Sequence, residues 1–193
     1  MKVACGCLLP VLYLYEMSIL NIEFKARCAD VSLAENRLQQ HHPVFKGTDN
    51  QLDTYFNVPA GRMKLREGNI ENALIHYERE NTADSKASHV LLYQHQPDEN
   101  LKAILSKALG VKAVVDKQRK IYFIENVKFH FDTVKELGTF IEVEAIDTDG
   151  SIGKEKLKEQ CGHYAKVLGV QQQDYISVSY SDMIMEMQRS VNI

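Results

Sequence analysis

Residues 21–27 read NIEFKAR, a segment in which polar or charged residues alternate strictly with apolar ones. The same pattern returns in residues 62–66, which read RMKLR, and in residues 141–145, which read IEVEA. Successive side chains of a β-strand point to opposite faces, so each segment has one apolar face and one ionic face. An ordinary antiparallel sheet carries mixed polar residues outside, not arginines and glutamates in register. Such strands fit a closed barrel with a charged interior and an outer face that packs against helices.

Length and composition fit one globular domain with a sizeable core. The chain has 193 residues, of which 45% are apolar and 25% charged. Its net charge of -3 gives no overall basic field of the kind that binds nucleic acid. Positive charge is gathered in short segments, which indicates a site. The four cysteines are too few and too unevenly spaced for a disulfide framework, so we expect reduced thiols and a cytoplasmic protein.

The first residues differ from the rest of the chain. Residues 3–15 are almost wholly apolar and follow Lys2, a weak form of the signal-peptide pattern that is too short to span a bilayer. We interpret residues 1–16 as an N-terminal extension and residues 17–193 as one domain. In this interpretation Met17 is the natural start, or the extension is a disposable leader.

Periodicity and turn residues predict about eight strands and three helices. The strands are expected at residues 19–28, 44–58, 62–68, 73–80, 89–96, 111–125, 127–134 and 139–146. The helices are expected at residues 30–42, 99–109 and 154–168. Residues 175–187 fit a strand or a helix. The predicted fold class is α+β: an eight-stranded antiparallel closed β-barrel with helices packed outside.

Two glutamates form the main acidic feature. Glu142 and Glu144 lie on one face of one strand, roughly 7 Å apart along the chain. Two carboxylates in a confined interior repel each other, and a divalent cation between them removes the repulsion. Oxygen ligands favour Mg²⁺ or Mn²⁺. Glu23 and Asp132 have the right parity to join this metal site, and the alternative is a pair of solvated glutamates on an exposed strand.

The basic residues fall into three clusters with i, i+2 spacing. Arginine offers phosphate a planar fork and lysine a point charge, so one interior that gathers the clusters suits a polyphosphate. The alternative is three unrelated basic stripes that face solvent. Arg79 is a further candidate whose parity is ambiguous. His130 lies on a face expected to turn inward, where a structural role or a role in supporting the site residues is expected before catalysis. The cluster residues are Lys25, Arg27, Arg62, Lys64, Arg66, Lys117 and Arg119.

Other common sites are not supported by the sequence. It contains no H-E-x-x-H zinc motif and no glycine-rich phosphate loop of the P-loop or dinucleotide-binding type. Cys28 and Cys161 have no recognisable histidine partner, so a thiol nucleophile is not expected.

The ordered motifs resemble those of the CYTH-domain proteins, the triphosphate tunnel metalloenzymes. The segments that carry the resemblance are 21–27 (NIEFKAR), 53–56 (DTYF), 61–67 (GRMKLRE), 117–122 (KQRKIY) and 140–144 (FIEVE). They stand in the family's order, and the likeness extends from about Ile19 to Leu168. One position departs from the family: its usual opening is E-x-E-x-K, and Asn21 replaces the first glutamate.

The resemblance implies a tunnel that binds a triphosphate together with Mg²⁺ or Mn²⁺. Carried over, Glu142 and Glu144 would hold the metal with Glu23 and Asp132 nearby, and the cationic residues would bind the phosphates. The catalytic residues implied are Glu23, Lys25, Glu142 and Glu144.

Family members include class IV adenylate cyclases, thiamine triphosphatases, inorganic tripolyphosphatases and RNA triphosphatases. The size, the N-x-E-x-K opening and the K-x-R-x-I-Y segment favour the cyclase-like branch, which converts ATP to cyclic AMP and pyrophosphate. Hydrolysis of tripolyphosphate, thiamine triphosphate or a nucleoside triphosphate is the first alternative, and a non-catalytic polyphosphate-binding module is the second. The expected partner is the small triphosphate, with neither nucleic acid nor membrane, and a homodimer is left open.

Overall fold

The computed structural model describes residues 19–79 and 85–191. The predictions about residues 1–16 and about Met17 as the start lie outside these residues. The strands within them are β1 (Ile19–Arg27), β2 (Val44–Phe56), β3 (Arg62–Glu67), β4 (Ala73–Arg79), β5 (Lys86–Gln94), β6 (Val111–Ile124), β7 (Val127–Val134) and β8 (Gly138–Asp147). The α-helices are α1 (Val31–Gln39), α2 (Glu99–Leu109), α3 (Lys154–Leu168) and α4 (Tyr180–Val191), and a short 3-10 turn spans Gln172–Asp174.

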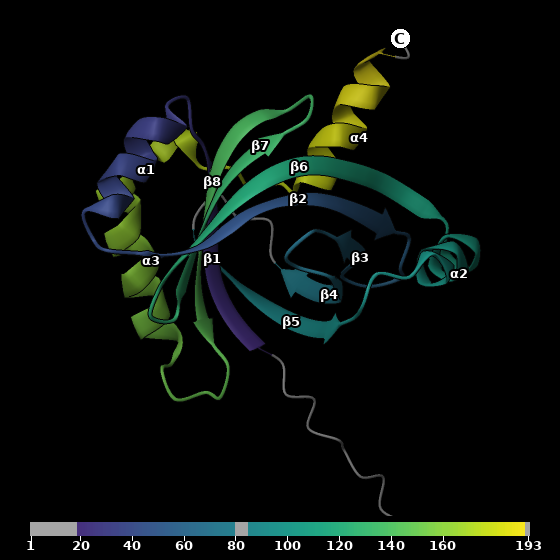
Figure 1. The fold of residues 1–193 in the computed structure, drawn as a ribbon, viewed down its shortest axis with the longest axis horizontal. Coiled ribbons are helices and arrows are strands. Elements are labelled where there is room, and N and C mark those ends of the chain that lie inside the picture. Colours follow the sequence, from purple (N-terminus) through teal and green to yellow (C-terminus); the bar gives the residue numbers. More distant parts are fainter. Residues whose placement is uncertain (1–18, 80–84, 192–193) are drawn as a thin grey trace, which may run out of the picture.

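The strands form one closed antiparallel barrel, which confirms the predicted fold class. Its strand order is β1-β5-β4-β3-β2-β6-β7-β8, and β8 closes the barrel onto β1. Closure leaves no strand edge without a partner. Figure 1 shows the long strands β2 and β6 running side by side across the molecule, with α1 and α3 on one flank.

Cross-strand pairing turns the ionic faces of the alternating strands to the same side. Lys25 pairs with Glu142 and Glu23 pairs with Glu144, both between β1 and β8. Residues that pair directly across two strands share a face, so these four side chains point into the barrel together.

The apolar faces of the same strands form the main core against the helices. Phe24 of β1 and Phe129 of β7 are almost fully buried beside Leu38 of α1 and Leu157 of α3. The side chain of Asp30 caps the start of α1 by accepting a hydrogen bond from the backbone N–H of Leu33 at 2.9 Å. α1 and α3 therefore cover the apolar outer face of these strands.

The C-terminal segment, for which the sequence fits a strand or a helix, forms α4. Its first turn packs on one end of the barrel, where Tyr180 and Ile184 contact Tyr55, Val115 and Phe140. Figure 1 shows α4, in yellow, beside β6. This end of the barrel is thus filled with side chains.

One strand begins earlier than predicted. β5 starts at Lys86 instead of His89. Polar residues such as Lys86 and Ser88 are typical of a loop, so the sequence did not predict a strand there. Both are buried, because the inside of this barrel is charged and accepts polar side chains. Among the described residues, Cys28 and Cys161 are free thiols. No helix in that part of the chain is long and apolar enough to cross a membrane.

Candidate functional site

The barrel holds a cavity of about 1270 Å³. Many charged side chains line it. They are Glu23, Lys25, Lys46, Lys64, Arg66, Glu71, Asp98, Lys117, Arg119, Lys128, Glu142 and Glu144. Eight of them are predicted site residues, and the other four are Lys46, Glu71, Asp98 and Lys128.

A buried carboxylate on β2 organises one group of cations. Asp53 accepts hydrogen bonds from Arg66 at 2.9 and 3.1 Å, from Lys117 at 2.6 Å and from Lys64 at 3.0 Å. Burial would raise the pKa of Asp53, but the charges of Arg66, Lys117 and Lys64 outweigh it and hold this pKa well below its usual range. One negative charge therefore faces three basic side chains.

Burial has the largest effect on the charge of Lys117. Its side chain is almost fully buried. Burial lowers the pKa of Lys117 well below its usual value against the opposing effect of Asp53, and the charges of Arg66 and Arg119 lower it further. A bound anion would supply the negative charge that this part of the cavity lacks.

A second buried carboxylate fixes Arg119. Asp132 accepts from the Arg119 guanidinium at 2.7 and 2.5 Å and from the Tyr180 hydroxyl at 2.8 Å. Arg119 also donates to Glu142 at 2.5 Å. Burial opposes ionisation of Asp132, but the Arg119 charge outweighs it and lowers this pKa. Both oxygens of Asp132 accept these bonds, so Asp132 orients Arg119, and it is not among the residues that line the cavity.

Lys25 connects α4 to the acidic side of the cavity. Its ammonium group forms an ion pair with Glu142 and lies 3.4 Å from the centre of the Tyr180 ring. A cation at this distance from an aromatic face is attracted to the ring.

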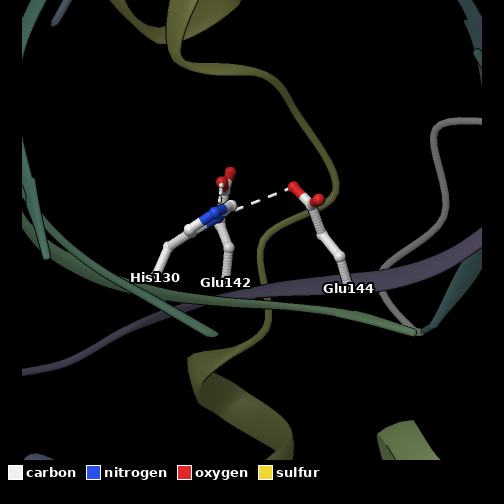
Figure 2. Close-up of side chains that lie close together, drawn as sticks. All are labelled: His130, Glu142 and Glu144. Carbon is white, nitrogen blue, oxygen red and sulfur yellow. Dashed lines mark ion pairs between the residues drawn. The ribbon is translucent and has the colours of Figure 1, made fainter. Parts of the chain in front are cut away.

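His130, Glu142 and Glu144 could together hold a metal ion, and Figure 2 shows their side chains directed toward one another from β7 and β8. One ligand atom from each residue lies within 4.8 Å of the other two. Nδ1 of His130 is 3.4 Å from Glu142 and 3.6 Å from Glu144, and neither ring nitrogen has a hydrogen-bond partner. Burial and then the charges of Arg119 and Lys128 hold the pKa of His130 well below its usual value, so the ring is neutral. A neutral imidazole and two carboxylates fit a divalent cation.

The turn between β3 and β4 adds the carboxylate of Glu71 to the cavity lining, beside Arg66 and Lys128. Glu71 accepts from Arg66 at 2.9 Å and from Lys128 at 2.5 Å. Asp49 holds the turn by accepting from the backbone N–H of residues 70 and 71. A Cβ on Gly68 would lie 2.6 Å from the Asp49 carboxylate, so the turn requires glycine at this position.

A family model described as the CYTH domain matches residues 20–180. The chain belongs to the CYTH domain family. Among curated proteins, none matches the sequence.

Solved structures share the CYTH fold of this chain. The PH1012 protein from Pyrococcus horikoshii OT3 is 23% identical with a TM-score of 0.74, and the match covers 84% of this chain and 98% of that one. A Vibrio parahaemolyticus protein described as a candidate adenylate cyclase is 18% identical with a TM-score of 0.71, over 86% of this chain and 98% of that one. A Hippeastrum protein described as an adenylyl cyclase candidate with a dominant triphosphatase activity is 14% identical with a TM-score of 0.55. That match covers 88% of this chain and 95% of the Hippeastrum chain.

Three of the predicted CYTH site residues lie outside the cavity lining. Arg27, exposed at the end of β1, donates to the carbonyl oxygen of Leu137 at 3.3 Å, and Arg62 donates to Asp182 at 3.2 Å. Asp132 is covered by the groups that it binds. The side chain of Arg79 lies outside the described residues.

Sequence reasoning missed the residues that orient the cations. Asp53 stood in a quoted motif without an assigned role, and Glu71 lies in a turn where periodicity gives no signal. The parity of β7 did carry a signal for Lys128, because residues 128, 130 and 132 share one face. Asn21 lines the cavity where the CYTH pattern has glutamate, and its side-chain oxygen is buried without a hydrogen-bond partner.

Proposed function

We propose that this protein is a metal-dependent enzyme that acts on a triphosphate bound inside its barrel. The observation that carries the proposal is the cavity in which four cations face two carboxylates, Asp53 and Glu71. The cations are Lys64, Arg66, Lys117 and Lys128. Such a cluster keeps a positive charge, and a triphosphate brings about four negative charges near neutral pH. The CYTH family assignment supports the same substrate class.

In this proposal Mg²⁺ or Mn²⁺ is held by Glu142 and Glu144. Glu23, the cross-strand partner of Glu144, and His130 complete the donor set. A divalent cation bound there would neutralise phosphate charge and orient phosphate oxygens for the displacement. The protein's own contribution is to fix Arg119 and Lys25 beside the carboxylates, so that phosphate oxygens meet cations already in position.

The reaction that we put first is the class IV adenylate cyclase type. Lys25, Arg66 and Lys117 would bind the triphosphate of ATP while its ribose 3′-hydroxyl attacks the α-phosphorus and pyrophosphate leaves. Residues 21–25 and 117–122 resemble that branch, and a protein of the same fold from Vibrio parahaemolyticus is described as a candidate adenylate cyclase.

Triphosphate hydrolysis is the second candidate. The specific observation in its favour is the Hippeastrum protein, which shares the fold and is described as having a dominant triphosphatase activity. Hydrolysis uses the same cations and carboxylates, with water in place of the ribose hydroxyl.

Product analysis separates these reactions. The protein is incubated with ATP, thiamine triphosphate or tripolyphosphate, each with Mg²⁺ or Mn²⁺. Cyclic AMP with pyrophosphate supports the cyclase, orthophosphate supports the hydrolase, and binding without turnover identifies a polyphosphate-binding module.

The metal site is tested by Glu144→Gln, with Glu159→Gln on the exposed face of α3 as the matched control. We expect Glu144→Gln to abolish metal-dependent turnover and the control to keep it. Full activity of Glu144→Gln at saturating metal would remove that carboxylate from the proposed site.

A further inference from the structure

The charged residues of the cavity do not surround it on every side. The inner faces of β4 and β5 contribute a wall that is mostly apolar: Ala73, Ile75, Tyr77, Val90 and Leu92. Ala73, Ile75 and Tyr77 form a small core cluster of their own, against which Val90 packs. We call these five residues the β4–β5 wall.

The β4–β5 wall lies directly beside the phosphate-binding cations. Lys64 of β3 pairs with Ile75 of β4, and Ile75 pairs with Leu92 of β5. Neighbouring strands are about 4.8 Å apart, so a group that leaves the cations reaches the wall within two strand spacings. The amino group of Lys64 lies 5.9 Å from the ring of Tyr77, which marks the border between the two surfaces.

Part of this wall is accessible. Leu92 keeps 46% of its surface exposed and Val90 is only half-buried, and both residues line the cavity as well as an outer groove. The cavity volume of about 1270 Å³ also exceeds the range of roughly 300–1,000 Å³ that is usual for small-molecule sites. Covering apolar surface of this kind with an apolar group in place of water is favourable.

We infer that the β4–β5 wall binds the organic part of the substrate, and that the protein therefore prefers an organic triphosphate ester to inorganic tripolyphosphate. This inference rests on the proposed function. The ring system or sugar of the ester packs on Ile75, Val90 and Leu92 while its phosphates contact Lys64 and Arg66. Tripolyphosphate contacts the cations alone and leaves the wall exposed to water.

The test compares Leu92→Ala with Leu91→Ala. An outer groove is lined by both residues, but only Leu92 also lines the cavity, so Leu91→Ala is the control for loss of contact in the groove. For each protein, kcat/KM is measured with ATP, thiamine triphosphate and tripolyphosphate in the presence of Mg²⁺. Calorimetric titration without added metal gives Kd values that do not depend on turnover.

We expect the parent to favour at least one of the two organic esters over tripolyphosphate. Leu92→Ala should weaken binding and kcat/KM for that ester about fivefold, the loss expected when one or two methylene groups lose their contact. Tripolyphosphate should bind Leu92→Ala as well as it binds the parent, and Leu91→Ala should change neither ligand.

The other outcomes overturn the inference in distinguishable ways. Preference of the parent for tripolyphosphate, or equal losses for all three ligands in Leu92→Ala, would reject the wall as an organic subsite and leave the triphosphate function standing. Absence of binding and turnover with every triphosphate would reject the proposed function, and the inference with it.

Discussion

The hydroxyl of Tyr180, the first residue of α4, donates a hydrogen bond to the buried Asp132, which in turn binds Arg119. Tyr180→Phe removes this oxygen and keeps the aromatic ring. The ring of Phe would still pack on Phe140, whose centroid lies 4.9 Å from that of Tyr180. It would also remain beneath the ammonium group of Lys25. The substitution therefore tests one hydrogen bond without opening a cavity.

The expected loss follows from the charge and burial of the acceptor. Asp132 is 1% exposed, and the Tyr180 hydroxyl donates to it at 2.8 Å. A hydrogen bond to a charged group contributes about 1.5–3 kcal/mol, and Asp132 keeps its bonds from Arg119 in the variant. We expect the free energy of unfolding to fall by about 2 kcal/mol, which lowers Tm by about 4–8 °C for a chain of this size.

Urea unfolding followed by circular dichroism measures this change. Tyr164→Phe is the matched control, because Tyr164 lies on α3 and packs outside the barrel against Phe129 with ring centres 4.7 Å apart. A Tyr180→Phe protein within about 0.5 kcal/mol of the parent, the usual range for a surface substitution, would refute the reasoning. The hydroxyl would then contribute nothing to the buried pair.

Two further predictions concern the cations of the cavity. Burial would raise the pKa of Glu71, but the charges of Lys128 and Arg66 outweigh it and lower this pKa from 4.5 to about 2. The resulting stability is complete above about pH 4.5 and is lost as the pH falls toward 2, so about 2 kcal/mol should disappear between pH 6 and pH 3. Urea unfolding of Glu71→Gln should show a smaller loss over the same range, and equal losses in parent and variant would contradict this. Calorimetric titration with tripolyphosphate should show at least tenfold weaker binding for Arg66→Ala, in line with a charge-assisted contact of about 1.5–3 kcal/mol. Arg62→Ala is the control, because the guanidinium of Arg62 pairs with Asp182 outside the cavity lining, and this variant should bind tripolyphosphate with an affinity close to that of the parent. A larger loss of affinity in Arg62→Ala than in Arg66→Ala would place the phosphates at the other end of β3.

The barrel and its acidic pair were predictable because they depend on parity. The alternation in residues 21–27 and 141–145 specifies which side chains share a face, and any closed barrel must turn one face inward. The alternation alone was enough to predict that Glu142 and Glu144 share one face. Their neighbours Lys25 and Glu23 follow once β1 pairs with β8.

Parity does not give the height of a residue along the barrel. Arg27 and Arg62 have the parity of Lys25 and Lys64, yet they lie nearer the strand ends and outside the cavity lining. Height depends on strand tilt and on the stagger between neighbouring strands, which are properties of the closed sheet.

The C-terminal helix was beyond local reasoning for a different reason. Residues 175–187 carry apolar residues that satisfy either period. The barrel end formed by Tyr55, Val115 and Phe140 offers an apolar surface to a helix, and this tertiary contact selects the helix. The role of Tyr180 follows only after that choice.

The buried carboxylates explain how so many cations can point into one cavity. Ionised side chains that leave water lose hydration, and attraction within the protein repays this loss only when each charge has well-placed partners. Asp53 and Asp132 supply such partners to Arg66 and Arg119 from neighbouring strands. The same bonds hold the guanidinium groups in one orientation before any ligand arrives. A phosphate that enters the cavity then meets donors whose conformational freedom is already restricted, so less of the binding free energy is lost in ordering them. On this argument Asp53 and Asp132 matter for substrate affinity although neither carboxylate would contact the substrate.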